Sequence, residues 1–215
     1  MSTPAPDTGS WWDQRYREGS DRWELGAPAP PLQLFLTQHA QAPQPPGRVL
    51  VPGCGRGHEA ALLAELGFAV VGLDFSAEAV REAGRLHGEQ PGRLTWLQAD
   101  LLDAEALAAA GLGPASCDGL LEHTCYCAID PALRLAYRQS VATLLRSEGW
   151  LLGLFWCHGR PGGPPYGSDA AQLVQDFQTA GFEQQLWLPA TNSAPGPDNK
   201  PRDNEWLGLW RRAAH

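Results

Sequence analysis

A loop of alternating glycines and a later carboxylate are the residues of this sequence best suited to bind a nucleotide-like ligand. Gly53, Gly55 and Gly57 follow a short apolar run and precede a helical pattern, so the chain can turn sharply and a ligand can approach its backbone. The first turn of the following helix adds unpaired N–H groups. Asp74 ends the next apolar run, 21 positions after Gly53, where a carboxylate can accept both hydroxyls of a ribose.

The spacing of these glycines excludes two common phosphate-binding loops. The dinucleotide fingerprint G-x-G-x-x-G needs a glycine at position 58, where the sequence has His58. A phosphate-cradling P-loop needs Gly-Lys followed by Ser or Thr, which the sequence lacks. One alternative stays open, in which Asp74 only caps a helix that begins near Ser76 in a ligand-free α/β domain.

The rest of the chain alternates strand and helix patterns, and this alternation positions the candidate residues. Strands are predicted at 48–52, 69–74, 94–98, 117–122, 149–156, 182–188 and 205–211. Helices are predicted at 11–19, 32–40, 57–67, 76–87, 103–110, 131–146 and 168–180. The pattern predicts an α/β fold, a Rossmann-like and mostly parallel sheet of seven strands with helices on both faces. We expect residues 1–215 to form one domain, with an N-terminal helical and aromatic cap (1–47) and a core (48–215).

Ligands of open parallel sheets bind beyond the carboxyl ends of the strands, so the residues there are the next candidates. Phe75 follows the second strand, and Asp100 with Leu101 follows the third, where they could bind and pack against an adenine. His123 follows the fourth strand, and its ordinary pKa of about 6.5 suits proton transfer, although it could also only hydrogen-bond the loop or a ligand. After the fifth strand, a Gly/Pro-rich loop could line a substrate mouth or be merely exposed; its candidates are His158, Arg160 and Tyr166.

Three aromatic residues precede the first predicted strand. Trp12 and Tyr16 are one helical turn apart, and Trp23 lies in an irregular segment rich in glycine and proline. Aromatic faces attract cations, most strongly when water is excluded, so these rings could roof a positively charged ligand. Spacing alone favours the plainer alternative, an aromatic face packed on the sheet, because such stripes usually belong to a core.

Composition limits the kinds of partner. A chain of 215 residues with 43% hydrophobic residues can build one sizeable core. Its net charge of −8 argues against binding nucleic acid or anionic membranes. The polar N-terminus has no secretory signal pattern and no apolar run approaches the ~18 residues of a membrane span, so we expect a cytoplasmic protein. The five cysteines fit no disulfide or zinc pattern and are expected to be buried thiols, with no metal bound.

Several segments together carry a more specific pattern. They are Trp12 with Tyr16 and Arg22–Gly26, then Val49–His58, Thr124–Arg134, Gly162–Tyr166 and Asn204–Trp206. The glycine loop resembles motif I of Rossmann-like, class I methyltransferases that use S-adenosylmethionine. From about Trp11 to Arg211, the chain resembles the thiopurine S-methyltransferase-like family, nearest its branch of thiol, thiocyanate and halide methyltransferases.

The resemblance implies S-adenosylmethionine as cofactor and S-adenosylhomocysteine as product. It implies that Trp12, Tyr16 and Trp23 enclose the cofactor, which reverses the preference drawn from spacing. It also implies cofactor contacts at Gly53, Asp74, Asp100, Leu101 and His123, to which the loop and strand-end positions add Gly55 and Phe75. His123 departs from the family pattern, because the branch usually has tyrosine there and the thiopurine enzymes have arginine. In the relatives this residue faces both the methyl donor and the acceptor.

Methyl transfer from a sulfonium is an in-line displacement, which requires alignment and exclusion of water but no metal. The expected acceptor is a small molecule with a soft nucleophile, foremost a thiol, whose proton has a pKa of about 8.5. His123 is the first candidate for contacting the acceptor or moving that proton, and Tyr16 and Glu122 are weaker alternatives. A halide, thiocyanate or other chalcogen acceptor, a nitrogen or oxygen acceptor, and a non-catalytic cofactor-binding protein stay open. We expect no obligatory protein partner and assign no role to residues 107–116.

Overall fold

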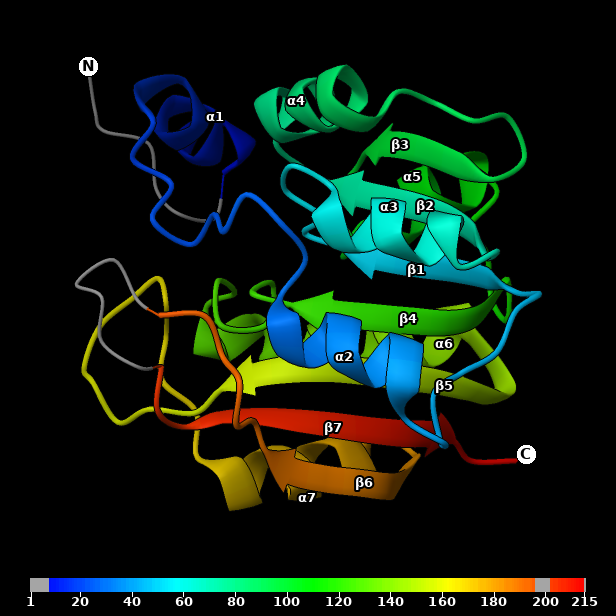
Figure 1. Ribbon diagram of the computed structural model, residues 1–215, viewed down its shortest axis with the longest axis vertical. Coiled ribbons are helices and arrows are strands. Elements are labelled where there is room, and N and C mark those ends of the chain that lie inside the picture. The colour runs from blue at the N-terminus through cyan, green and yellow to red at the C-terminus, as the bar shows by residue number, and fades with distance from the viewer. Residues whose placement is uncertain (1–7, 196–201, 215) are drawn as a thin grey trace.

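The computed structural model describes residues 8–195 and 202–214, and within them seven strands form one sheet. The strands are β1 (Arg48–Pro52), β2 (Ala69–Asp74), β3 (Leu94–Gln98), β4 (Cys117–His123), β5 (Leu145–Trp156), β6 (Phe182–Pro189) and β7 (Glu205–Arg212). They lie side by side in the order β3-β2-β1-β4-β5-β7-β6 (Figure 1). The predicted Rossmann-like sheet of seven strands is thereby confirmed.

Strand direction brings the ends of five strands to one edge of the sheet. Strands β1 to β5 are paired in parallel, whereas β7 runs antiparallel to both β5 and β6. The carboxyl ends of β1 to β5 therefore meet at one edge, on the left in Figure 1. The loops that carry the candidate residues leave the sheet at this edge, as expected for an open parallel sheet.

One strand begins earlier than its sequence pattern predicts. Strand β5 starts at Leu145 rather than at 149, because Leu145 pairs with Cys117. The register then shifts, and pairing resumes between Trp150 and Gly119. Between these pairs Glu148 has a φ of 63°, in the left-handed region, which is typical of an irregularity that bends one strand. Polar residues in this irregularity interrupt the apolar pattern, so the first part of the strand could not be predicted from hydrophobicity.

The predicted helices are present, with some changed ends. They are α1 (Gly9–Glu18), α2 (Pro30–Gln38), α3 (His58–Glu65), α4 (Ala77–His87), α5 (Ala104–Ala109), α6 (Arg134–Leu144) and α7 (Ala170–Thr179). Helix α2 begins two residues before the predicted 32, because proline is tolerated in the first turn of a helix. The helix predicted at 131–146 starts as a 3-10 turn, η1 (Pro131–Leu133), which Asp130 caps by accepting a hydrogen bond from the Ala132 N–H at 2.8 Å.

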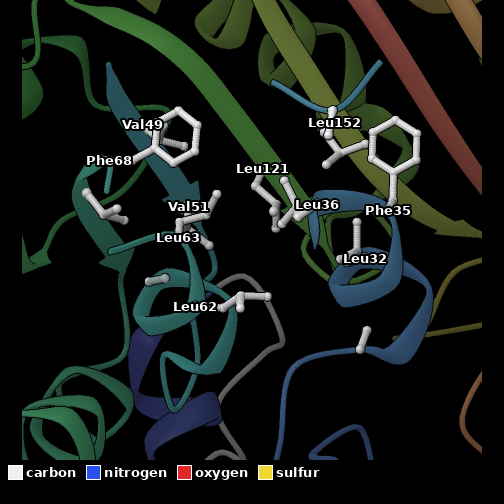
Figure 2. Close-up of a cluster of buried hydrophobic side chains, with 14 of the residues drawn as sticks. Leu32, Phe35, Leu36, Val49, Val51, Leu62, Leu63, Phe68, Leu121 and Leu152 are labelled. Atoms are coloured by element: carbon white, nitrogen blue, oxygen red, sulfur yellow. The ribbon is translucent and has the colours of Figure 1, made fainter. Parts of the chain in front are cut away.

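Two clusters of buried apolar side chains, one on each face of the sheet, form the core. On the face that carries α2 and α3, Leu32, Phe35 and Leu36 of α2 point toward Leu121 and Leu152 of the sheet (Figure 2). The same cluster contains Val49, Val51, Leu62, Leu63 and Phe68. On the opposite face, α5, α6 and α7 contribute Leu107, Tyr137, Val141, Leu173 and Phe177. The sheet is thus covered by helices on both faces, as predicted (Figure 1).

The N-terminal helix is fixed to the sheet through helix α4. Helix α1 lies beside α4, and Asp13 of α1 accepts hydrogen bonds from the Ser76 hydroxyl at 2.6 Å and from the Glu78 N–H at 3.1 Å. The chain between α1 and α2 then passes the carboxyl edge of the sheet (Figure 1). Within residues 8–195 and 202–214, none of the helices has both the length and the apolar composition to cross a membrane.

Candidate active site

A cleft of about 1740 Å³ opens at the carboxyl edge of the parallel strands. Its walls come from α1, from the segment that follows α1, and from the loops after β1, β2, β3, β4 and β5. Most of the residues singled out in the sequence line it: Trp12, Tyr16, Trp23, Gly53, Asp74, Phe75, Asp100, Leu101, His123, His158, Arg160 and Tyr166. Gly55 is not among the lining residues, but its N–H donates a hydrogen bond to Asp74, which is one of them. The fold therefore brings residues from across the chain to one cavity.

Gly53 and Gly55 are two of the glycines that the tight loop requires. Gly53 has a φ of 58° and Gly55 a φ of 54°, a backbone region that side-chain-bearing residues rarely adopt. A Cβ on Gly53 would lie 2.8 Å from the Cys125 Cβ, and one on Gly55 would lie 3.0 Å from the Tyr16 hydroxyl oxygen. The missing side chains keep the backbone close to the cleft and let Tyr16 reach over the loop.

Asp74 is held in place at the end of β2 by two backbone donors. Its Oδ2 accepts a hydrogen bond from the Gly55 N–H at 3.0 Å, and its Oδ1 accepts one from the Ser76 N–H at 2.9 Å. Burial raises the pKa of the carboxyl to about 6, although these two donors oppose the rise. A carboxylate oxygen can accept more than one hydrogen bond, so Asp74 can still accept from a ligand hydroxyl.

The end of β3 supplies a second carboxylate and an apolar surface. Asp100 is exposed to the cleft, and its Oδ1 accepts a hydrogen bond from the Leu102 N–H at 2.8 Å, which fixes the turn. Leu101 beside it is buried, and Phe75 at the end of β2 is half-buried. A polar acceptor next to an apolar wall is a combination that suits a planar heterocycle with an amino group.

The aromatic residues near the N-terminus pack on one another at the cleft. The rings of Trp12 and Trp23 meet edge to face with centroids 5.2 Å apart, and those of Tyr16 and Trp23 with centroids 5.9 Å apart. All three are half-buried and line the cavity. Burial, and secondarily the charge of Asp74, raise the pKa of the Tyr16 hydroxyl well above its ordinary value. Tyr16 therefore stays protonated at neutral pH and can donate a hydrogen bond.

A network of charged side chains joins the segment after α1 to the glycine loop. Arg56 forms ion pairs with Asp21 and, at 3.4 Å, with Glu24. His58 Nε2 lies 2.9 Å from Glu24 Oε1, which also accepts a hydrogen bond from the Gly26 N–H at 2.6 Å. Burial alone would raise the pKa of Glu24, but His58, the Gly26 N–H and Arg56 lower it to about 2. The sequence analysis missed this network. Asp21 and Glu24 show their structural role only in the folded chain, where they pair with Arg56 and His58 of the distant glycine loop.

His123 is held by a carboxylate that the sequence analysis also missed. Its Nδ1 lies 2.9 Å from Glu59 Oε1, on the first turn of α3, and the same oxygen accepts a hydrogen bond from the Ala29 N–H at 3.0 Å. The His123 side chain is only 10% exposed, and its Nε2 has no partner among the described residues. Burial lowers the pKa of His123, but the charges of Glu59, Glu205 and Glu122 outweigh this effect and raise it.

Glu122, the residue before His123, has a hydrogen-bond partner on each carboxylate oxygen. Its Oε1 accepts a hydrogen bond from the Tyr126 N–H at 2.8 Å, and its Oε2 accepts one from the Tyr137 hydroxyl. The side chain is 1% exposed, and burial raises its pKa. Both oxygens thus tie the loop after β4 to helix α6, which makes Glu122 less suited than His123 to receive a proton from a ligand.

The loop after β5 forms the far wall of the cleft. The rings of His158 and Trp156 lie with centroids 4.3 Å apart, and the Arg160 guanidinium lies 5.1 Å from the Trp156 ring centroid. Arg134 of α6 donates to the carbonyl oxygen of Tyr166 at 3.2 Å, and the Tyr166 N–H donates to the Cys127 carbonyl at 2.6 Å. The loop is therefore fastened to the loop after β4, so the two can line one acceptor pocket.

Each of the five cysteines is a free thiol. Cys54, Cys117 and Cys157 are buried, as predicted, whereas Cys125 and Cys127 are half-buried and line the cleft. Burial raises the pKa of Cys125 well above its ordinary value and that of Cys127 to about 12. Both thiols stay protonated at neutral pH and are poor nucleophiles in that form.

Comparison with known proteins supports the resemblance seen in the sequence. The sequence model of the thiopurine S-methyltransferase family matches residues 7–200 of this chain. "Probable thiol methyltransferase 2" of Arabidopsis thaliana is 30% identical over 206 residues, covering 94% of this chain and 85% of the relative. "Thiocyanate methyltransferase 1" of the same plant is 28% identical over 214 residues, covering 94% and 84%.

A solved structure agrees at the level of the fold. It is the 1,6-didemethyltoxoflavin-N1-methyltransferase of Burkholderia thailandensis, solved with S-adenosylhomocysteine bound, which is 21% identical and has a TM-score of 0.72 over 96% of this chain and 87% of its own. The family match spans most of this chain, and both the plant relatives and the fold agree with it. The chain therefore belongs to the thiopurine S-methyltransferase family, and it is an S-adenosylmethionine-dependent methyltransferase.

Proposed function

We propose that this methyltransferase methylates the sulfur of a small thiol, and that His123 receives the thiol proton. The observation that carries the proposal is the His123 imidazole at the wall of the cleft. Its Nδ1 is held by Glu59, while its buried Nε2 has no partner among the described residues. His123 lines the cleft, and a ring nitrogen without a protein partner can accept a proton from an acceptor that reaches it.

The residues of the glycine loop and of the strand ends suit S-adenosylmethionine. Gly53 and Gly55 keep the backbone open to the ligand, and the Asp74 carboxylate at the end of β2 can accept hydrogen bonds from the ribose hydroxyls. Asp100 can accept a hydrogen bond from the adenine amine, while Leu101 packs on the ring. Phe75, at the end of β2, adds apolar surface to the same wall.

The aromatic residues suit the charged end of the same cofactor. The faces of aromatic rings attract cations when water is excluded, and Trp12, Tyr16 and Trp23 line the cleft together. Tyr16 keeps its proton at neutral pH, so we assign it to binding and orientation rather than to proton removal. His123 would contact both the cofactor and the acceptor from the end of β4.

A thiol acceptor loses a proton during methylation, so a side chain of the protein must accept that proton. When bound, S-adenosylmethionine supplies an electrophilic methyl group, so the acceptor sulfur gains the methyl group and its proton must go elsewhere. His123 takes that proton at Nε2 and becomes an imidazolium, which the surrounding carboxylates favour. Bound cofactor and acceptor would displace water from the cleft, which strengthens the attraction between imidazolium and thiolate. The proton passes to solvent once the product has left.

The loops after β4 and β5 are the proposed acceptor pocket. His158, Arg160 and Tyr166 line the cleft there, and Arg134 fastens their loop to helix α6. We propose that they contact the acceptor. The net charge of −8 supports a small-molecule acceptor over a nucleic acid, and we place the protein in the cytoplasm without an obligatory protein partner.

The second candidate is methylation of thiocyanate, a halide or another chalcogen anion. Such acceptors carry no proton to remove, and a His123 with a raised pKa could attract them as an imidazolium. A thiocyanate methyltransferase is among the relatives. A weaker candidate is a nitrogen or oxygen acceptor.

Assaying release of S-adenosylhomocysteine with a panel of thiols, hydrogen sulfide, thiocyanate, halides, amines and phenols tests the proposal. We expect turnover of thiols, and H123Q should lower kcat/KM for them by about 10²–10⁴-fold. The Kd for S-adenosylhomocysteine should change much less, and H39Q, at the end of α2, is the matched control. Turnover of thiocyanate or halides alone would support the second candidate. Cofactor binding without turnover of any of these acceptors would contradict both candidates.

A further inference from the structure

We propose that Glu59 is the positioning residue for His123: its carboxylate holds the proton on Nδ1 and so leaves Nε2 to take the proton of a thiol acceptor. This inference rests on the proposed function, which it deepens by naming the group that makes His123 a base. It also divides the possible acceptors into two kinds, those that must lose a proton and those that are already anionic.

The hydrogen bonds at Glu59 determine which ring nitrogen carries the proton. One oxygen of Glu59, Oε1, lies 2.9 Å from His123 Nδ1 and 3.0 Å from the Ala29 nitrogen. The Ala29 N–H can only donate, and an ionised carboxylate can only accept. His123 must therefore donate from Nδ1. In the neutral ring the remaining nitrogen, Nε2, then carries a lone pair and acts as the acceptor.

Glu59 is itself fixed by the fold. It lies on the first turn of α3, directly after the glycine loop, and its side chain is 12% exposed. Burial alone would raise the pKa of Glu59, but the charge and hydrogen bond of His123, with the Ala29 N–H, lower it. The carboxylate is therefore ionised at neutral pH and connects three parts of the chain: the start of α2, the start of α3 and the end of β4.

The charged groups around His123 favour its protonated form. Glu59 faces it from α3, Glu122 precedes it on β4, and Glu205 approaches from β7. Glu122 is bound to the Tyr137 hydroxyl, and Glu205 has Arg202 at 3.7 Å. Glu59 alone among these acids has an oxygen within hydrogen-bond distance of the His123 ring in the described chain. Its charge should therefore have the largest effect on proton transfer to Nε2.

The proposed step balances as follows. The thiol S–H bond breaks, its electron pair stays on sulfur, and the proton moves to His123 Nε2, giving a thiolate beside an imidazolium. The pair carries the same total charge as the neutral thiol and neutral imidazole. The Glu59 carboxylate stabilises the imidazolium through Nδ1. An acceptor that is already an anion, such as thiocyanate, gains nothing from this step.

E59Q tests the inference, because glutamine keeps the shape and an oxygen that can accept from both donors while it removes the charge. The control E65Q makes the same change at an exposed position of the same helix. The first measurement is an NMR titration of the His123 ring in the cofactor-free protein. We expect its pKa to fall by about one to three pH units in E59Q and to stay unchanged in E65Q.

The second measurement is kcat/KM against pH with a thiol and with thiocyanate as acceptors. In E59Q the acid limb of the thiol profile should move to lower pH by the same amount as the NMR pKa, and its plateau should drop about tenfold or more. At pH values above the His123 pKa of the wild type, where the ring is neutral in both proteins, turnover of thiocyanate should stay within about threefold of the wild type. An equal loss with both acceptors would show that Glu59 is merely structural and would overturn the inference.

The two proposals can fail separately. A wild-type protein that methylates no thiol contradicts the proposed function, whereas a wild-type protein that does so with an unchanged His123 pKa in E59Q contradicts the role of Glu59 alone. If E59Q does not fold, E59D replaces it, because aspartate keeps the charge but is too short to hold both donors. E59D should then lower the plateau for thiols and shift the His123 pKa less than removal of the charge would. An unchanged plateau and pKa in E59D would also overturn the inference.

Discussion

Binding of S-adenosylhomocysteine should weaken as the pH falls through the pKa of Asp74. Burial raises this pKa from 3.8 to about 6, against the opposing effect of the Ser76 and Gly55 N–H groups. The side chain is only 7% exposed, and the ionised form is the one that can accept two ribose hydroxyls. Below about pH 6, part of the protein must therefore release a proton before it can bind the ligand.

The size of the effect follows from the pKa. If only the ionised carboxylate binds, the Kd rises about tenfold for each pH unit well below the pKa and is constant well above it. Between about pH 7.5 and about pH 5 the expected loss is about tenfold, or ~1.4 kcal/mol. Titration calorimetry at about pH 6, in buffers with different ionisation enthalpies, should detect about half a proton released per ligand bound.

D74N is the variant that isolates this titration. It removes the charge and one of the acceptor oxygens, so the Kd at neutral pH should rise by about 10–100-fold, the loss of a hydrogen bond to a charged group. Any pH dependence that persists in D74N comes from other groups, such as His123 and His58, and is subtracted. The reasoning is refuted if the Kd of the wild type and of D74N change by the same factor between about pH 7.5 and about pH 5.

The raised pKa of Asp74 also predicts that D74N, although it weakens ligand binding, makes the folded protein more stable. Because the folded pKa of about 6 exceeds the ordinary 3.8, the folded protein binds more protons than the unfolded chain between these values. The ionised carboxylate therefore lowers the free energy of unfolding above about pH 6, by about 3 kcal/mol. D74N removes this cost and loses one backbone partner worth about 1 kcal/mol. Urea unfolding at neutral pH should show D74N to be more stable, by about 2 kcal/mol, and less able to bind.

Three further substitutions test other parts of the cleft. G53A places a side chain at a φ of 58° and 2.8 Å from the Cys125 Cβ, so it should lose about 1–3 kcal/mol in urea unfolding and bind S-adenosylhomocysteine more weakly. E24Q should destabilise the protein most at about pH 6 and least at about pH 8. Glu24 raises the pKa of His58, and the stability gained from a raised histidine pKa is lost as the pH rises through that pKa. Thermal unfolding of E24Q and the wild type at both pH values checks this. Y16F should raise the Kd for S-adenosylhomocysteine but leave the shape of the pH profile of kcat/KM unchanged, because the pKa of Tyr16 lies well above neutral pH; a shifted profile would assign Tyr16 to proton transfer.

Much of the fold could be predicted because the apolar runs and helical patterns are each short and well separated. Strands such as β1 and β2 are buried almost throughout and read as continuous apolar runs. The prediction missed the start of β5, because Arg146 and Glu148 are polar and belong to a register shift. It placed a single helix at 131–146, because a 3-10 turn and an α-helix share nearly the same pattern of apolar residues.

The candidate site could be predicted where one segment carries its own signal, and it was missed where two distant segments meet. The glycine loop and Asp74 are recognisable because a fixed spacing joins them. Glu59 has no such signal, since its partners, Ala29 and His123, lie 30 and 64 positions away and from sequence it is one more acid on a helix. The same holds for Glu24, whose partner His58 is identified only by the folded chain.

The tight packing around the glycine loop explains why position 58 can carry a histidine where the dinucleotide fingerprint has a glycine. In the dinucleotide fingerprint, the third glycine lets the helix approach the strand. Here that approach occurs one residue earlier, because a Cβ on Gly57, or on Gly72 of the neighbouring strand β2, would overlap the Trp96 ring. Position 58 is thereby free to carry a side chain, and His58 uses it to bind Glu24 from the segment after α1. The glycine loop that we propose to bind the cofactor therefore also holds the segment after α1, through the contact between His58 and Glu24.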